Sequence, residues 1–352
     1  MAKRKQASTT RARVASQLRA RPVVIDAHTH VGSSPAAWLS DETPYALSAE
    51  SLVVRMEADR IGAAVCFPFA YSEYFDAAAY AAGRLRRSAR ARGSVPFEFE
   101  NRRLMREVYE TRLDAPPTLL PFAFFDPGRE QGGQARLIRA LARRYPLYGL
   151  KTATSYLRSH VTRLRGAGAC LLDLAAELDV PVTIHSAVHP HDPWADVSKI
   201  LDVVRARADV RFVVAHTCRF DRRALETAAE LDNCFVDFSA FHIHCELALV
   251  DGDAVAPKKR RFPAKYRDHT AAMARIAEAF PATMVWGSDV PYHRWHARFV
   301  DDRGRTTISD LACGPHVEAK HLYELDARTR RRIAYTNTMR MLFGPAASGK
   351  KA

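Results

Sequence analysis

The sequence predicts an α/β fold in which eight parallel strands close into a (β/α)8 barrel, the TIM barrel. Eight short and nearly continuous apolar runs are spaced along the chain, and segments with helical periodicity separate them. Such alternation is typical of βαβ units and of a parallel sheet whose strands are buried on both faces. The 352 residues also suffice for one barrel of about 250 residues with insertions.

The predicted strands are short and rich in β-branched and aromatic residues. They span residues 23–27, 63–67, 119–125, 147–150, 182–184, 211–215, 234–238 and 283–286. The predicted helices span residues 49–60, 171–178, 195–206, 222–231, 270–280 and 327–342. This order of strands and helices favours a closed barrel over an open sheet.

Four connections are too long for simple crossovers, and each begins at the carboxyl end of a predicted strand. They span residues 28–47, 68–117, 239–268 and 288–315. Barrel enzymes build their sites from the loops at this end, so we expect long loops over the C-terminal face. No Gly- and Ser-rich linker divides the chain, and residues 22–344 are therefore predicted to form a single domain.

The two ends of the chain lack the pattern of the barrel. Residues 1–21 contain seven Lys or Arg and no acid, and they are expected to form a disordered basic tail. A basic segment rich in Ser and Thr is also typical of an organelle transit peptide. Residues 345–352 are expected to form a flexible C-terminal tail.

The net charge of +14 raises the question of nucleic-acid binding. Part of this charge lies in segments 1–21 and 84–92, where basic residues occur without acids, and no aromatic stacking motif accompanies them. A solvated basic surface is therefore favoured, and nucleic-acid binding remains a remote alternative.

The chain contains no run of 18 apolar residues, so no membrane partner is expected. Its six cysteines lie far apart without a Cys-x-x-Cys pair, which is typical of reduced thiols and favours a cytoplasmic protein. We expect a homo-oligomer, most simply a dimer, that acts on a small molecule.

Histidines at the end of the first predicted strand point to a metal site. In the segment VVIDAHTH, His28 and His30 lie two positions apart and so face the same side of a strand. Two imidazoles at this spacing can bind one divalent metal. The motif alone is weak, because His189/His191 and His242/His244 show the same spacing without an assigned task.

Other predicted strands also end in polar residues: Lys151 after the fourth, His185 after the fifth, His216 after the sixth and Asp289 after the eighth. One shared site explains these positions together, whereas buried structural histidines would need a separate explanation for each.

Imidazoles with one carboxylate favour Zn2+, with Fe2+ or Mn2+ as alternatives, and a metal with an open position activates water. The predicted ligands are His28, His30, His185 and Asp289. Asp289 is also suited to move a proton, and His216 to polarise a substrate carbonyl.

The segments VIDAHTH, GLK, TIHS, VVAH and WGSDVP resemble the amidohydrolase superfamily, most closely its amidohydrolase 2 branch of metal-dependent hydrolases and non-oxidative decarboxylases. The resemblance covers residues 23–343. It implies His28, His30 and His185 as metal ligands, Asp289 as ligand and proton shuttle, and His216 as catalytic histidine or second-metal ligand.

The resemblance leaves two roles open for Lys151. In binuclear members a lysine at this place is carbamylated and bridges two metals. In many single-metal members it is absent or carries no carbamate, and Lys151 would then be free to bind a substrate carboxylate. We favour a single metal.

Several residues on loops are secondary candidates. Arg219 and His293 are candidate substrate-binding residues, although Arg219 could equally be an ordinary surface arginine. Asp126 and Asp237 are expected to orient histidines or to cap loops. The candidate pocket-lining residues are Trp38, Phe69, Tyr71 and Tyr74, and packing beneath the loops explains these four at least as well.

The sequence thus predicts a metal-dependent hydrolase that acts on a C–O or C–N bond of a small organic substrate, carboxylated substrates included. The alternative is a metal-dependent non-oxidative decarboxylase, because both reactions use the same metal ligands.

Overall fold

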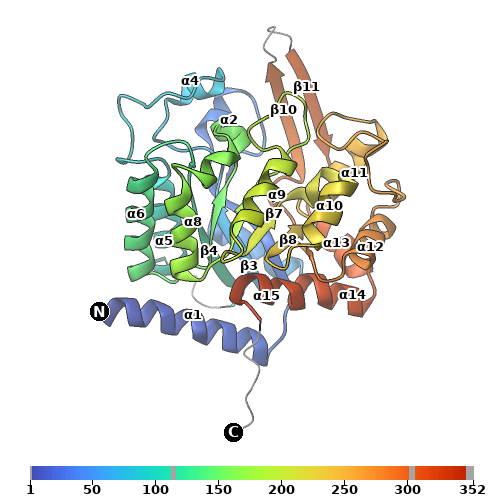
Figure 1. The fold of residues 1–352 in the computed structure, drawn as a ribbon, viewed down its shortest axis with the longest axis horizontal. Helices are drawn as coiled ribbons and strands as arrows, with labels where there is room; N and C mark the ends of the chain where they lie inside the picture. Colours follow the sequence, from blue (N-terminus) through green and yellow to red (C-terminus); the bar gives the residue numbers. More distant parts are fainter. Residues whose placement is uncertain (1, 112–115, 301–305, 346–352) are drawn as a thin grey trace.

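Eight parallel strands form a closed barrel at the centre of the molecule (Figure 1). The computed structural model describes residues 2–111, 116–300 and 306–345. The barrel strands are β1 (Ile25–Ser33), β3 (Ala63–Pro68), β4 (Thr118–Phe124), β5 (Gly149–Thr152), β6 (Val182–Ile184), β7 (Phe212–Val214), β8 (Cys234–Asp237) and β9 (Met284–Val285).

Neighbouring barrel strands are also consecutive along the chain, apart from the edge strand β2 (Ala46–Leu47), which pairs antiparallel with the end of β1. Backbone hydrogen bonds join the first strand to the last. The Ala27 N–H donates to the Trp286 carbonyl at 2.9 Å, and the His30 N–H donates to the Val290 carbonyl at 2.8 Å. The predicted barrel is therefore confirmed.

Helices surround the strands (Figure 1). Those that connect one barrel strand to the next are α3 (Ala49–Ala58), α5 (Glu98–Tyr109), α6 (Gln131–Arg144), α8 (Ala169–Leu178), α9 (Val197–Ala206), α10 (Arg222–Ala229) and α12 (His269–Ala279). The chain ends in α14 (Ala327–Arg331), η3 (Arg332–Thr336) and α15 (Asn337–Phe343), which together occupy the last predicted helix.

Helix α9 illustrates how the sequence produces these outer helices. Asp196 caps its start, because the carboxylate accepts the backbone N–H groups of Ser198 and Lys199. Ile200 and Val204 lie one turn apart and are both buried against the barrel. The cap and the apolar face together fix where the helix begins and which side faces the core.

Shorter elements are inserted between the barrel strands and the outer helices. They are α2 (Pro35–Leu39), α4 (Ala77–Ala81), α7 (Thr154–Leu157), η1 (Val161–Arg165), η2 (His216–Phe220), α11 (Phe241–Leu249), β10 (Arg294–Val300), β11 (Thr306–Ala312) and α13 (Val317–Glu324). The antiparallel β10–β11 hairpin follows β9 and was not predicted. The Thr43 N–H donates to the His296 carbonyl at 3.0 Å, which ties this hairpin to the loop after β1.

The structure corrects the prediction for the N-terminal segment. Instead of a disordered tail, residues 2–20 form helix α1 (Ala2–Ala20), which lies beside α15 in Figure 1. Leu18 is buried among residues from the starts of the barrel strands and from α15, and Val14, one turn earlier, packs against the same cluster. The Arg11 guanidinium donates to the carbonyls of Leu178 and Asp179, both at 2.8 Å, and so satisfies acceptors at the end of α8.

The packing of α1 against the barrel is not predicted from the sequence, because only a few apolar residues of the segment, among them Val14 and Leu18, take part in it. Of the predicted C-terminal tail, residues 346–352 lie outside the described part of the chain.

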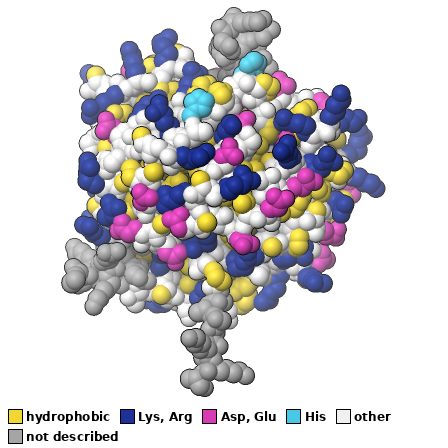
Figure 2. Space-filling view, in the orientation of Figure 1, with side chains coloured by type: hydrophobic (Ala, Val, Ile, Leu, Met, Phe, Trp, Pro, Cys, Tyr) yellow, Lys and Arg dark blue, Asp and Glu magenta, His cyan; other side chains and the backbone are white. Residues whose placement is uncertain are grey.

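On the face shown in Figure 2, basic and acidic side chains are intermixed. Lys and Arg side chains are spread over the whole face and alternate with Asp and Glu. No helix within the described ranges is long and apolar enough to cross a membrane. All six cysteines are free thiols.

Candidate metal centre

Three of the predicted metal ligands meet where β1 and β9 end. Asp289 Oδ1 lies 3.2 Å from His28 Nε2 and 3.3 Å from His30 Nε2. All three residues are buried, and one potential ligand atom from each lies within 4.8 Å of the other two. The spacing seen in VIDAHTH therefore does bring both imidazoles to one carboxylate.

The second ring nitrogen of each histidine already has an acceptor. His28 Nδ1 lies 2.8 Å from Asp237 Oδ2, and His30 Nδ1 lies 3.1 Å from the Pro68 carbonyl. A neutral imidazole that donates through Nδ1 carries its lone pair on Nε2. Both Nε2 lone pairs therefore face the Asp289 carboxylate.

With both imidazoles neutral, three acceptors would face one another without a hydrogen between them, an arrangement that suits a divalent cation. Asp289 Oδ1 is buried and accepts no well-formed hydrogen bond from the described residues. An unsatisfied buried carboxylate oxygen is costly, and a bound metal would remove that cost. Oxygen and imidazole nitrogen are also ligands that zinc, iron and manganese accept.

Local backbone features explain how β1 and β9 approach so closely. The pairing of β1 with β3 shifts register between Asp26 and Thr29, a bulge of the kind that re-aims side chains beside active sites. Asp26 Oδ1 accepts the N–H groups of His28 at 3.0 Å and of Ser288 at 2.9 Å. Gly287 is needed here, because a Cβ at that position would lie 2.7 Å from the His28 Cβ.

The charges of the cluster also favour a cation. Burial would raise the pKa of Asp289, but His28 and His30 outweigh that effect and hold the pKa well below its usual range. Burial lowers the pKa of His30 to about 4. The Asp289 carboxylate is thus ionised and the His30 imidazole neutral at pH 7, which are the protonation states of metal ligands. Burial would lower the pKa of His28, but Asp237 and Asp289 outweigh that effect and raise it.

Lys151 lies beside this cluster at the end of β5. Its Nζ is 3.3 Å from His28 Nε2 and 4.6 Å from the centre of the Phe67 ring. Burial lowers the pKa of the Lys151 amine to about 8. The amine therefore contacts a predicted metal ligand directly.

The structure places His185 in a second group, together with His216 and Arg219. His185 Nδ1 lies 2.9 Å from His216 Nε2, and His185 Nε2 lies 2.9 Å from Arg219 Nη2. Arg219 Nη1 also contacts His244 Nε2, and Arg219 Nε donates to the Ser186 carbonyl at 2.6 Å. Both ring nitrogens of His185 thus face partners other than the cluster of His28, His30 and Asp289.

A left-handed turn brings His216 and Arg219 to the same side. Each residue from His216 to Phe220 has a positive φ, between 48° and 64°. In a turn with three residues per repeat, positions three apart lie on one face, which accounts for the common direction of His216 and Arg219. Such conformations cost about 1–2 kcal/mol for each non-glycine residue, and strain of this kind concentrates at functional sites.

The two predicted orienting carboxylates have different tasks. Asp237 contacts His28 through Oδ2 and accepts the His216 backbone N–H at 2.8 Å through Oδ1. Asp126 instead accepts the Gly128 N–H at 2.7 Å and pairs with Arg129 at 2.7 Å. Asp237 therefore orients site histidines, whereas Asp126 holds a loop.

Of the remaining predicted site residues, one lies beside the metal cluster and the others lie away from it. His293 Nδ1 lies 3.4 Å from Arg55 Nη1 on α3. This side chain therefore contacts a residue that does not belong to the metal cluster. Phe69 is buried with its ring centre 5.6 Å from that of His30. Trp38 is 65% exposed and packs on Tyr45. Tyr71 and Tyr74 lie in an apolar cluster beneath the loops.

Three residues near the site were not assigned in the sequence. Tyr292 has its ring centre 5.3 Å from His30, and Tyr156 has its ring centre 5.5 Å from His185. His244, on α11, contacts Arg219 and has its ring centre 5.2 Å from that of His216. Only the repeated His-x-His spacing marked His244, and nothing in the sequence placed it beside Arg219.

A closed barrel with buried histidines and carboxylates gathered at the carboxyl ends of its strands defines a class of barrel enzymes. The chain belongs to the amidohydrolase family, in its amidohydrolase 2 branch, because the family's model matches residues 25–344. The resemblance seen in the sequence is confirmed. The protein is thus an enzyme of the amidohydrolase kind, and that superfamily generally uses divalent metals.

Solved structures with the same fold include a candidate 2-pyrone-4,6-dicarboxylic acid hydrolase from Pseudomonas putida, at 17% identity over 92% of this chain and 97% of that chain, with a TM-score of 0.54. They also include IDCase from Metarhizium anisopliae, at 13% identity over 92% and 98%, with a TM-score of 0.52. Dihydroorotase from Campylobacter jejuni matches at 12% identity over 90% and 82%, with a TM-score of 0.51. At these identities the similarity shows the fold alone. No curated protein sequence matches the chain.

Proposed function

We propose that the protein is a metal-dependent hydrolase that opens a C–O or C–N bond of a small carboxylated substrate. The observation that carries the proposal is the convergence of two imidazole lone pairs and one unsatisfied carboxylate oxygen in His28, His30 and Asp289. We propose Zn2+ as the metal, with Fe2+ or Mn2+ as alternatives, since this ligand set accepts all three.

We keep His185 as a proposed metal ligand, but its side chain would have to move to reach the metal. Its Nδ1 faces His216 and its Nε2 faces Arg219, so it would reach the metal only by giving up one of these contacts. The geometry by itself favours His28, His30 and Asp289 as the primary ligands.

Arg219 supports a substrate with a carboxylate. Its side chain is buried, and it forms no ion pair with a carboxylate among the described residues. A buried guanidinium without an anionic partner is costly, and its planar donor groups match a carboxylate. We therefore propose that the substrate supplies the missing anion at Arg219.

The proposed roles of the site residues follow from their contacts. A bound divalent metal would polarise a carbonyl and lower the pKa of water toward about 7. Asp289, as an ionised carboxylate at the ligand cluster, would take a proton from water and return it to the leaving group. Burial lowers the pKa of His216 well below its usual range, and its Nδ1 faces the Ser239 carbonyl at 3.2 Å. His216 would therefore stabilise the substrate oxygen where negative charge develops in the form that also carries a proton on Nε2.

We propose a single metal, with Lys151 acting as a free amine toward the substrate. Added bicarbonate should then leave the metal content and the activity of the reconstituted enzyme unchanged. A bicarbonate-dependent gain in both would show that Lys151 is carbamylated and bridges two metals.

Arg219 also favours hydrolysis over the alternative of decarboxylation. A cation that binds a carboxylate stabilises the charged group that a decarboxylase must remove. The test is to incubate the metal-loaded enzyme with carboxylated lactones and cyclic amides and with carboxylated aromatic compounds. Ring-opened acids without CO2 release support the proposal, whereas CO2 release from an intact ring contradicts it.

A further inference from the structure

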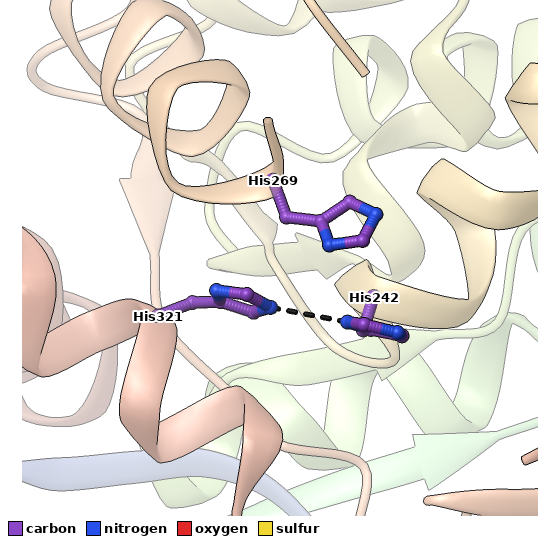
Figure 3. Close-up of side chains that lie close together, drawn as sticks. All are labelled: His242, His269 and His321. Atoms are coloured by element: carbon purple, nitrogen blue, oxygen red, sulfur yellow. Dashed lines mark hydrogen bonds between the residues drawn. The ribbon is translucent and has the colours of Figure 1, made fainter. Parts of the chain in front are cut away.

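A second group of histidines lies on α11, α12 and α13 and shares no residue with the cluster at β1 and β9. His242 belongs to α11, His269 to α12 and His321 to α13, so three separate segments of the chain contribute. Figure 3 shows the three imidazoles gathered in one space between these helices. One potential ligand atom from each ring lies within 4.8 Å of the other two.

The rings are close enough to share one ion. His242 Nδ1 lies 3.1 Å from His321 Nε2, and the ring centres of His242 and His269 are 4.2 Å apart. His321 is buried, while His242 and His269 are half-buried. Solvent metal can therefore reach the group, and the surroundings are still dry enough to hold ligands in place.

Groups behind the rings fix the direction of the His321 lone pair. The Thr270 hydroxyl donates to Glu324 Oε2 at 2.6 Å, so its oxygen is free to accept from His321 Nδ1, which lies 3.0 Å away. His321 then carries its lone pair on Nε2, the atom that faces His242. A carboxylate that orients a histidine in this way is the usual support of a metal ligand.

A carboxylate also lies against the His269 ring. His269 Nε2 is 2.9 Å from Glu246 Oε1, and Glu246 follows His242 by one helical turn on α11. Three imidazoles with a fourth place for water or a carboxylate match the coordination that Zn2+ adopts in proteins.

We propose that His242, His269 and His321 bind a second divalent transition metal, Zn2+ or a metal of similar preference, outside the active site. The metal would join α11, α12 and α13, which are otherwise separate in sequence. Helix α11 also carries His244, the residue that contacts Arg219. The site would therefore stabilise the helix that supports the proposed substrate-binding arginine.

The test measures zinc binding with the first cluster removed. The full-length His28→Ala/His30→Ala protein is titrated with Zn2+ by equilibrium dialysis, and its melting temperature is followed with and without zinc. We expect it to retain one zinc equivalent per chain and to melt higher with zinc. Adding His242→Gln or, separately, His269→Gln should abolish both effects. Adding His189→Gln, a half-buried histidine of another histidine pair, is the matched control and should change neither.

Two results would overturn the proposal. One is zinc binding and stabilisation that persist in both glutamine variants. The other is a His28→Ala/His30→Ala protein that takes up no zinc below millimolar concentration. Circular dichroism identifies a variant that fails to fold, and the second glutamine variant then decides. If no metal binds at His28 and His30, mutating these two residues would instead leave the zinc content unchanged. The two hypotheses can therefore fail separately.

Discussion

Asp237 Oδ2 lies 2.8 Å from His28 Nδ1, and this contact determines which nitrogen of His28 faces the metal cluster. Because the imidazole donates through Nδ1, its lone pair is on Nε2, toward Asp289. The other Asp237 oxygen accepts the backbone N–H of His216. One carboxylate thus positions a proposed ligand and a proposed catalytic residue.

The first prediction concerns Asp237. In Asp237→Asn one oxygen becomes an amide donor, so either His28 or the His216 backbone loses its acceptor. We expect metal affinity to fall by about 10–100-fold, the usual effect of removing such a support. Competition with a chelator measures it. Asp126→Asn, another buried carboxylate that holds a loop, is the control and should bind metal as the unaltered protein does. Equal affinities in both variants would contradict the orienting role.

The second prediction separates metal binding from proton transfer at Asp289. Asp289→Asn keeps the size and one oxygen but loses the basicity of the carboxylate. We expect the variant to fold, to retain appreciable metal, and to lose at least ~10²-fold in turnover. Steady-state kinetics on a substrate from the panel above, with metal content measured on the same sample, checks this. Near-normal turnover would show that Asp289 does not move the proton.

The third prediction concerns helix α1 at the opposite end of the barrel from the site. Removing residues 2–20 exposes the apolar residues that Leu18 packs against and removes the Arg11 contacts to α8. We expect the free energy of unfolding to fall by at least ~2 kcal/mol, the scale for one buried leucine. Turnover per folded molecule should stay the same. Leu18→Ala should reproduce part of the loss in denaturant titrations, and exposed Arg19→Ala should not. An unchanged unfolding midpoint after truncation would mean that α1 contributes nothing.

The fourth prediction is a pH dependence of stability that comes from Glu100 on α5. Burial raises the pKa of Glu100 to about 7, although its carboxylate accepts from the Ser72 hydroxyl and the Glu73 N–H. The folded state therefore binds this proton more tightly than the unfolded state does. Its contribution is present in full below about 4.5, and is lost as pH rises through about 7.

The size of this effect is at most on the order of 3 kcal/mol, from 1.36 kcal/mol per pKa unit. Glu100→Gln cannot ionise, so its free energy of unfolding should vary less between pH 4.5 and 7. Urea titrations at several pH values measure this. The same slope in both proteins would assign the pH dependence to other groups.

The sequence predicts the barrel and the His28–His30–Asp289 cluster because both follow from simple periodicities. Buried strands have continuous apolar runs, and residues two apart share a face, so a strand end specifies a direction for its side chains. The direction of His185 could not be predicted in this way. It depends on Arg219 and His216, which a left-handed turn of non-glycine residues brings together.

The group of His242, His269 and His321 lay beyond prediction for a different reason. Its members come from three helices, and only their packing brings them together. Helix α1 was missed because a few apolar residues, among them Val14 and Leu18, are too weak a pattern against many charges.

Anomalous diffraction from crystals of the unaltered protein, recorded on both sides of the zinc absorption edge, tests the central claim most directly. A peak between His28 Nε2, His30 Nε2 and Asp289 Oδ1 is the predicted result, and in His28→Ala/His30→Ala crystals the peak should be absent. If Fe2+ or Mn2+ is bound instead, the same position should show a peak at the edge of that metal. Active, unchelated protein with no anomalous peak at this position at any of the three edges would contradict the account.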